Sequence, residues 1–152
     1  KRAGSFGANL LGADIRDIDD NQIKSLNVKM VSLDDLLRQS DFVTLHCDLN
    51  HTSDRLISAK ALKLMKKSSV LLNLARGPIV DEIALIDALL SGEISGAALD
   101  VFDHEPLAND SPLKEMDNVM LAPHNCNSSP HAWEAVHWST IHQLVTALKA
   151  AS

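Results

Sequence analysis

The stretch VLLNLARGPIVDEIALIDALL (Val70–Leu90) decides the fold class, because it joins a short apolar run to a capped amphipathic segment. Val70–Leu74 has the length of a strand, and its near-continuous apolarity is typical of a strand covered on both faces. Asp81 is placed to cap the helix that follows, and Gly92 lies where a C-terminal glycine belongs. A strand that runs into a helix is the repeating unit of parallel sheets.

The same alternation continues in both directions along the chain. Four more apolar runs have strand lengths: Asn9–Asp14, Phe42–His46, Gly96–Val101 and Asn118–Ala122. Ser32 opens a capping box, Ser58 is placed to cap Ala59–Met65, and Pro130 precedes a long segment with an apolar period near 3.6. This order predicts an α/β fold, a doubly wound, Rossmann-like parallel sheet of five strands with helices on both faces.

Composition excludes several classes of protein. With 152 residues, 45% of them hydrophobic, the chain can form one domain with a real core. Lys and Arg number 14 against 20 Asp and Glu, a net charge of −6 without a basic block, so we expect no nucleic-acid partner. No apolar run approaches the roughly 18 residues of a membrane span and no signal peptide is visible. We therefore expect no membrane partner and a cytoplasmic location.

Cysteine and histidine spacing gives no sign of a disulfide framework or a metal site. Cys47 and Cys126 stand alone, and we expect both to be small core or site-wall residues in a reducing compartment. His131, His137 and His142 lie six and five residues apart, which does not place two ligands on one helical face.

Polar residues stand at the carboxyl ends of the predicted strands, where ligands bind in sheets of this kind. Asp14 ends the first run, and a carboxylate there can accept hydrogen bonds from an adenine-ribose diol. It would repel a 2′-phosphate and so favours NAD over NADP, although nearby Arg16 leaves some room for NADP. The alternative is a capping or surface aspartate. His46, Cys47 and Asp48 follow the second run.

Arg76 leaves the strand end of the opening stretch beside Gly77, which allows the backbone to turn sharply. A guanidinium at that point can donate two parallel hydrogen bonds to a carboxylate. The alternative is an ion pair with a structural acid, either Asp81 or Glu82.

Glu105 and His124 follow the last two strands, so they and Arg76 can converge at one edge of the sheet. An acid beside a histidine stabilises the imidazolium and fixes its tautomer. A histidinium can then give a proton to a carbonyl oxygen while a hydride arrives at the carbon. Many α/β proteins carry such residues in loops, so spacing alone leaves a structural role open.

Four segments resemble the NAD-binding domain of the D-isomer-specific 2-hydroxyacid dehydrogenases, the phosphoglycerate dehydrogenase and glyoxylate reductase family. They are VSLDDLLRQSDFVTLH (Val31–His46), LLNLARGPIVDEIALIDAL (Leu71–Leu89), SGEISGAALDVFDHEPL (Ser91–Leu107) and NVMLAPH (Asn118–His124). Their order and spacing match over essentially the whole chain. The resemblance implies an oxidoreductase that transfers a hydride between NAD(H) and a D-2-hydroxy acid or 2-keto acid. It also implies a homo-oligomer.

The resemblance further implies the role of each site residue. Arg76 would grip the substrate's carboxylate and keto oxygen, His124 would be the acid/base, and Glu105 its partner. Asp14 would bind the adenine ribose, and Asp100 would hold the nicotinamide carboxamide. Further cofactor contacts would come from His46, Cys47, Asn73, Ala75, Arg76 and His124.

The chain departs from the family pattern at its start, because no G-x-G-x-x-G turn follows a strand. We therefore expect residues 1–152 to be a partial dinucleotide-binding domain, lacking the first strand, the Gly-rich turn and the substrate domain, and inactive alone. Asp48 replaces a usual proline, and we expect a carboxylate there to be solvated rather than buried. The polar stretch 125–129 follows the acid/base histidine and would flank the substrate.

Two alternatives remain open, a non-catalytic nucleotide-binding or assembly module and an inactive fragment derived from the family. An upstream extension with a Gly-rich turn favours the enzyme, and a true start at Lys1 favours the module. A parallel sheet without one strand has an unpaired edge, so we expect the isolated chain to self-associate.

Overall fold

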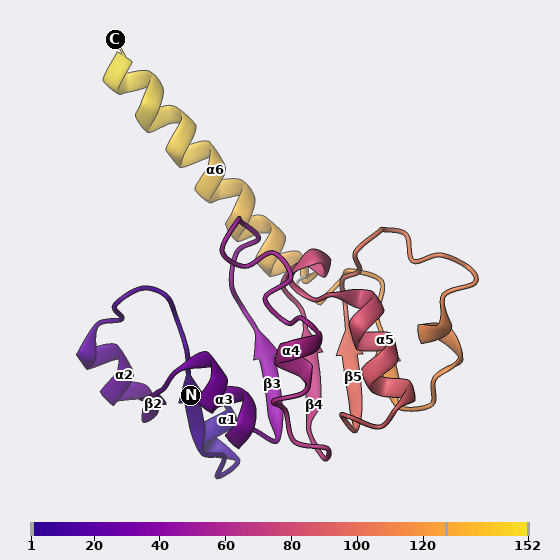
Figure 1. The fold of residues 1–152 in the computed structure, drawn as a ribbon. Coiled ribbons are helices and arrows are strands. Elements are labelled where there is room, and N and C mark those ends of the chain that lie inside the picture. Colours follow the sequence, from indigo (N-terminus) through magenta and orange to yellow (C-terminus); the bar gives the residue numbers. More distant parts are fainter. Residues whose placement is uncertain (1, 127, 152) are drawn as a thin grey trace.

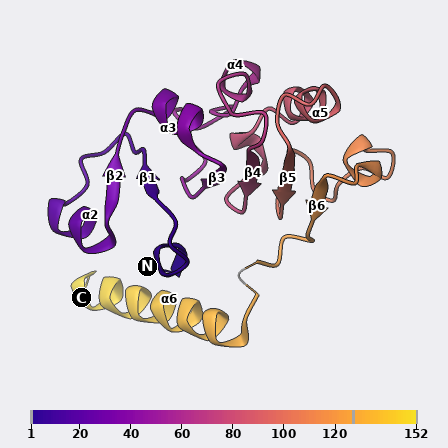
Figure 2. The ribbon, with the colours of Figure 1, turned by 90° about the horizontal axis from the view of Figure 1, so that it is seen from below.

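The computed structural model describes residues 2–126 and 128–151, and its strands form two parallel sheets. The larger sheet consists, in spatial order, of β3 (Phe42–Leu45), β4 (Val70–Asn73), β5 (Gly96–Leu99) and β6 (Val119–Leu121). The smaller sheet pairs β1 (Leu10–Gly12) with β2 (Val28–Met30). In Figure 1 the arrows of β3 and β5 point the same way, and Figure 2 shows β1 and β2 beside the β3 edge.

The Rossmann-like parallel sheet predicted from the sequence is confirmed, but the strand count is wrong. Within the described residues, six strands in two sheets replace the five expected in one. The strand that was missed is β2, whose three residues include Lys29 and therefore lack a recognisable apolar run. In the described part of the chain, β1 and β3 are not paired, so each sheet ends there in an open edge.

Strand register places the loops of the candidate site residues at one edge of the larger sheet. Leu45, Asn73, Leu99 and Leu121 form one cross-strand row at the carboxyl ends of the four strands. Because all four strands are parallel, the loops that carry Arg76, Glu105 and His124 leave from this same edge.

Helices cover one face of the larger sheet (Figure 2). These are α3 (Leu33–Gln39), α4 (Ala59–Leu62) and α5 (Glu82–Leu90). Leu37, Leu62 and Leu85 of these helices belong to the same buried cluster as Val43 and Leu71 of the sheet.

The opposite face is largely open, contrary to the expected covering of both faces. Phe42 and Met120 lie on it and are 71% and 72% exposed. Neither α1 (Arg2–Ser5) nor α2 (Asp20–Leu26) contributes a buried residue. The described residues therefore supply helices for one face and leave the other available to further protein.

Local start signals explain two of the three covering helices. The Ser32 hydroxyl accepts a hydrogen bond from the Asp35 amide, and the Asp81 carboxylate accepts one from the Ala84 amide. Both predicted caps are confirmed, as is the left-handed Gly92 after α5. The prediction for Ser58 is wrong, because its side chain makes no capping bond and α4 ends at Leu62. Beyond that residue the backbone tightens into three-residue turns.

The long helix α6 (Pro130–Ala151) begins at the predicted proline, but its large apolar side chains are exposed in the part of the chain that the structure describes. Trp133, Ile141 and Leu148 are each about half exposed or more. Figure 1 shows the helix projecting away from the sheets. The remaining elements are two short turns, η1 (Gly77–Ile79) and η2 (Pro112–Glu115). No helix within residues 2–126 and 128–151 has the length and apolar character needed to span a membrane.

Candidate active site

The loop after β4 presents Arg76 in an extended backbone conformation, and the side chain of Asn73 holds that loop in place. Asn73 is buried, its Oδ1 accepts from the Ala75 amide at 3.1 Å, and its Nδ2 donates to the Arg76 carbonyl at 2.9 Å. The Arg76 side chain is exposed and donates to the Ala75 carbonyl. Asn73 therefore sets the direction in which the guanidinium leaves the sheet.

The structural alternative for Arg76, an ion pair with Asp81 or Glu82, is not what the structure shows. Asp81 pairs with Arg55 at 3.3 Å, and Glu82 accepts a hydrogen bond from the Asp103 amide at 3.1 Å. Among the residues that the structure describes, the Arg76 guanidinium has no acidic partner, so its fork is available to an external carboxylate.

Gly77 brings the Arg76 loop against the loop after β5. A Cβ built on Gly77 would lie 1.8 Å from the Phe102 carbonyl oxygen and 2.6 Å from the Asp103 amide nitrogen. The expected sharp turn is present as η1, which begins at Gly77, but the residue does not have a positive φ. Glycine is required here by the close approach of two backbones rather than by a turn.

The loop after β5 carries Glu105 and is tied down at three points. One Glu105 oxygen, Oε1, accepts from the Phe102 amide at 3.1 Å, which fixes the carboxylate on its own loop. Glu82 holds the Asp103 amide, and Arg55 bridges Asp103 and Asp81 with both contacts at 3.3 Å. The position of Glu105 therefore depends on groups from the loop before α4 and from α5.

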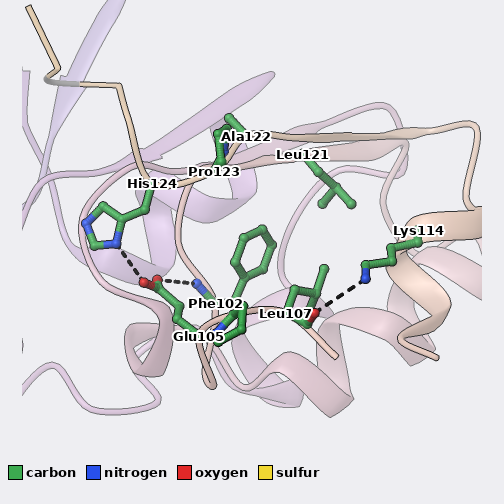
Figure 3. Close-up of a pocket in the computed structure, with 9 residues that line it drawn as sticks. Phe102, Glu105, Leu107, Lys114, Leu121, Ala122, Pro123 and His124 are labelled. Carbon is green, nitrogen blue, oxygen red and sulfur yellow. Dashed lines mark hydrogen bonds and ion pairs between the residues drawn. The ribbon is translucent and has the colours of Figure 1, made fainter. Parts of the chain in front are cut away.

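His124 lies directly opposite Glu105, as the sequence predicts. Its Nδ1 is 2.7 Å from Glu105 Oε2 (Figure 3). An ionised carboxylate can only accept, so Nδ1 carries the proton of this bond and Nε2 is left for another partner. The hydrogen bond from His124 lowers the pKa of Glu105 below its ordinary value. Glu105 is thus held as an anion beside the imidazole.

The backbone of His124 adopts a left-handed conformation, with φ at 54°. This region is unfavourable for a side chain with a Cβ and is retained only where neighbouring contacts fix it. Asp100 supplies those contacts, since its two oxygens accept from the amides of Asn125 and Cys126, both at 2.9 Å.

Asp100 is 3% exposed, and two opposing effects act on its pKa. Burial raises the pKa, but the hydrogen bonds from Cys126 and Asn125 and the nearby His124 outweigh burial and leave it below the ordinary value. Asp100 was expected at the nicotinamide carboxamide, and the structure places its carboxylate beside the loop that follows His124. A sequence offers no pattern that marks this contact across 25 residues.

An open hollow of about 620 Å³ adjoins the Glu105–His124 pair. Figure 3 shows carbon-rich side chains along it, with Lys114 at the end away from His124. The lining includes Phe102, Leu107 and Leu121. One side of the Glu105–His124 pair therefore faces an apolar wall.

Asp14 lies past the end of β1, in a bidentate pair with Arg16. Arg16 Nη2 and Nε donate to Asp14 Oδ2 and Oδ1 at 3.0 and 3.1 Å, and the Arg16 amide donates to Oδ1 at 2.9 Å. These bonds lower the pKa of Asp14 to about 2. The carboxylate is therefore ionised at neutral pH, as ribose binding requires.

His46 and Cys47 stand exposed at the carboxyl end of β3. His46 Nε2 lies 3.0 Å from the Thr44 hydroxyl, and partial desolvation raises the pKa of the Cys47 thiol although the residue is exposed. Both cysteines are exposed, which excludes the core position but not the site wall. Asp48 is exposed as expected. Of the polar stretch after His124, residue 127 lies outside the described residues.

The structure thus brings Glu105 and His124 into direct contact, and joins the Arg76 loop to them through Gly77 and Phe102. Asp14 lies apart from these residues, on the smaller sheet. The sequence did not identify Arg55 as a residue that holds the Glu105 loop, because its partners are 26 and 48 residues away.

Comparison with known proteins shows that the chain matches a known protein family. A family described as D-isomer specific 2-hydroxyacid dehydrogenase, NAD binding domain, matches residues 1–126. A glyoxylate reductase of Thermofilum pendens is 41% identical over 149 residues, covering 98% of this chain and 44% of that protein. The chain therefore spans less than half the length of this relative.

Solved structures agree with this placement. A glyoxylate reductase from Paecilomyes thermophila superposes with a TM-score of 0.89 at 32% identity, covering 96% of this chain and 44% of the other. A D-isomer specific 2-hydroxyacid dehydrogenase from Lactobacillus delbrueckii ssp. bulgaricus, in an NAD-complexed form, gives 0.83 at 29% identity, with coverage of 97% and 47%.

Proposed function

The chain belongs to the D-isomer specific 2-hydroxyacid dehydrogenases as their NAD-binding domain, and from this premise we propose that the full-length protein reduces a small 2-keto acid to a D-2-hydroxy acid. The observation that carries the proposal is the Glu105–His124 pair, which lies at the sheet edge that also presents Arg76, a residue with no acidic partner in the described part of the chain. On its own the partial domain is expected to be inactive.

His124 is the proton donor of the proposed reaction. Bound NADH would supply the hydride that reduces the keto carbon. As the carbon–oxygen double bond opens, its electron pair moves to the oxygen, which takes the proton from His124 Nε2. Before the transfer, Glu105 stabilises the positive charge of the doubly protonated ring, and it keeps Nδ1 protonated so that Nε2 faces the substrate.

Arg76 orients the substrate. Its exposed guanidinium presents parallel N–H groups that match a carboxylate, and the adjacent keto oxygen can take a further N–H. Asn73 holds the backbone of Ala75 and Arg76, so the guanidinium extends from a fixed position.

The residues present fit the two ends of a dinucleotide. Asp14 suits the adenine ribose, and His46, Cys47, Ala75 and Asp100 lie at or just past strand carboxyl ends, where nicotinamide would be held. Within the described ranges no glycine-rich turn follows a strand, so the pyrophosphate contact would come from another part of the full-length protein.

The finer surroundings are part of the same proposal. We expect a homo-oligomer in the cytoplasm. The half-exposed apolar side chains of α6, such as Ile141 and Leu144, support burial against further protein. Sedimentation of the full-length protein at two concentrations tests the oligomer, and a monomer at both would contradict it.

The activity test is oxidation of NADH by the full-length protein with a panel of small 2-keto acids, glyoxylate and hydroxypyruvate among them. Arg76→Ala should abolish most of the activity. Arg38→Ala is the matched control, since it removes a similarly exposed arginine whose acidic partners in the described chain are Asp34 and Asp35 on α3. No activity with any acid, or equal activity of Arg76→Ala and wild type, would overturn the proposal.

A further inference from the structure

Arg55, in the segment between β3 and α4, contacts both loops of the candidate site. Its backbone amide donates to the carbonyl of Pro78, two residues after Arg76, at 2.8 Å. Its Nη2 lies 3.3 Å from Oδ2 of Asp103, two residues before Glu105. A third loop therefore ties the residue that would bind the substrate to the residue that holds the proton donor.

The other end of the guanidinium fixes Arg55 to the start of α5. Its Nη1 lies 3.3 Å from Asp81 Oδ1, the same oxygen that accepts a hydrogen bond from the Ala84 amide. A planar guanidinium that holds two carboxylates sets the distance between them, which the single ammonium of a lysine does not. The position of Asp103 relative to α5 thus depends on Arg55 as well as on Glu82, whose carboxylate accepts from the Asp103 amide.

The backbone around Arg55 is held by its own contacts. Its φ is 49°, in the left-handed region that is unfavourable for a residue with a Cβ and persists only where neighbouring contacts fix it. Two residues further on, Ile57 donates to the Ile79 carbonyl and accepts from the Asp81 amide, both at 3.0 Å. The Arg55 side chain therefore leaves from a defined position.

We propose that Arg55 is a positioning residue of the reaction. It sets the distance between the proton donor and the guanidinium that binds the substrate, so that one 2-keto acid can meet both. It acts through Asp103 and Pro78 rather than by touching the substrate. The inference rests on the proposed function, because it requires that the full-length protein reduce a 2-keto acid.

Two effects of removing Arg55 have opposite signs, so a pH profile separates them. Loss of a nearby cation alone would favour protonation of His124 and would raise the pH above which kcat/KM declines. Displacement of Glu105 removes the anion that stabilises the charged ring, so this pH would fall. A further acid whose charge acts on the ring, Asp100, is held by two backbone amides of the following segment and stays in place in both cases.

The test is the pH dependence of kcat/KM in the full-length protein with saturating NADH and the faster substrate of glyoxylate and hydroxypyruvate. Arg55→Ala should lower kcat/KM at least about tenfold, because a misplacement of about 1 Å can cost about 100-fold in rate. The pH above which kcat/KM declines should fall by about one pH unit. Arg55→Lys keeps the charge without the bridge and should share the downward shift. Asp103→Asn tests the same step from the other side of the ion pair and should also share it.

Lys66→Ala is the matched control, because it breaks another exposed ion pair between loops, with Asp41 at 2.8 Å near the amino ends of β3 and β4. It should leave the pH profile unchanged. An unchanged kcat/KM in Arg55→Ala, or a lower one whose decline stays at the wild-type pH or moves upward, overturns the positioning role. A wild type that reduces neither acid overturns the proposed function, and the role of Arg55 with it.

Discussion

Gly77→Ala is expected to disrupt the site and to cost more stability than any other single methyl group added to a glycine of this chain. The new Cβ would lie 1.8 Å from the Phe102 carbonyl oxygen and 2.0 Å from its carbonyl carbon. A carbon and an oxygen in contact stand about 3.3 Å apart, so the two backbones must separate by about 1.5 Å.

The neighbouring contacts leave little room for such a separation. The Phe102 amide donates to Glu105, and the Asp103 amide donates to Glu82. Overpacking costs about 1–3 kcal/mol, and because the obstacle is backbone we expect a loss of about 3 kcal/mol in the free energy of unfolding. The same shift would move Glu105 away from His124.

Urea unfolding of the 152-residue chain measures the loss. Gly4→Ala is the matched control, because its Cβ would meet only Leu10 Cδ1 at 3.8 Å and alanine stabilises a helix by about 0.5–1 kcal/mol over glycine. If Gly77→Ala unfolds within 0.5 kcal/mol (roughly the size of an ordinary surface substitution) of the wild type, the close approach of the two loops is refuted.

Three further predictions concern the site. Arg76→Lys should lower kcat/KM of the full-length protein by about 10- to 100-fold, because lysine lacks the fork; an unchanged value would contradict a bidentate contact. Asp100→Asn should cost about 1–3 kcal/mol and speed hydrogen exchange at the amides of Asn125 and Cys126, and unchanged exchange would remove Asp100 as their anchor. The last is a pH effect: because His124 lowers the pKa of Glu105 below 4.5, the contribution of this carboxylate to stability is present above pH 4.5 and lost as the pH falls through the lowered pKa. Glu105→Gln should therefore make the free energy of unfolding depend less on pH in the acid range. An unchanged pH dependence would count against the Glu105–His124 pair.

Sequence patterns predicted the larger elements of the fold because those elements are determined locally. The caps at Ser32 and Asp81 and the proline at the start of α6 each act within one helical turn, and all three appear in the structure. The strand β2 was missed because three residues, one of them charged, carry no period. The apolar period of α6 was predicted, but the sequence could not say what would cover it, because burial depends on a partner element and the large apolar side chains of α6 are exposed in the described chain.

The candidate site also has one part that the sequence could predict and another that it could not. Glu105 and His124 could be predicted to meet, since both follow parallel strands at one edge and an acid commonly partners a histidine. The contacts that hold these two side chains in place could not be predicted. Arg55 reaches Asp103 across 48 residues, and Gly77 is required by a backbone that lies 25 residues further along the chain. Such contacts depend on the packing of loops, for which a single sequence has no local signal.

The central claim is that His124 gives a proton while a hydride reaches the adjacent carbon of a 2-keto acid. The most direct measurement uses NADH with deuterium at the transferred C4 position and follows the label in the product of the full-length protein. The account predicts a D-2-hydroxy acid with one deuterium at C2, and a His124→Gln variant whose turnover falls far more than its NADH affinity. A product without deuterium at C2, or a His124→Gln variant that turns over like the wild type, would contradict it.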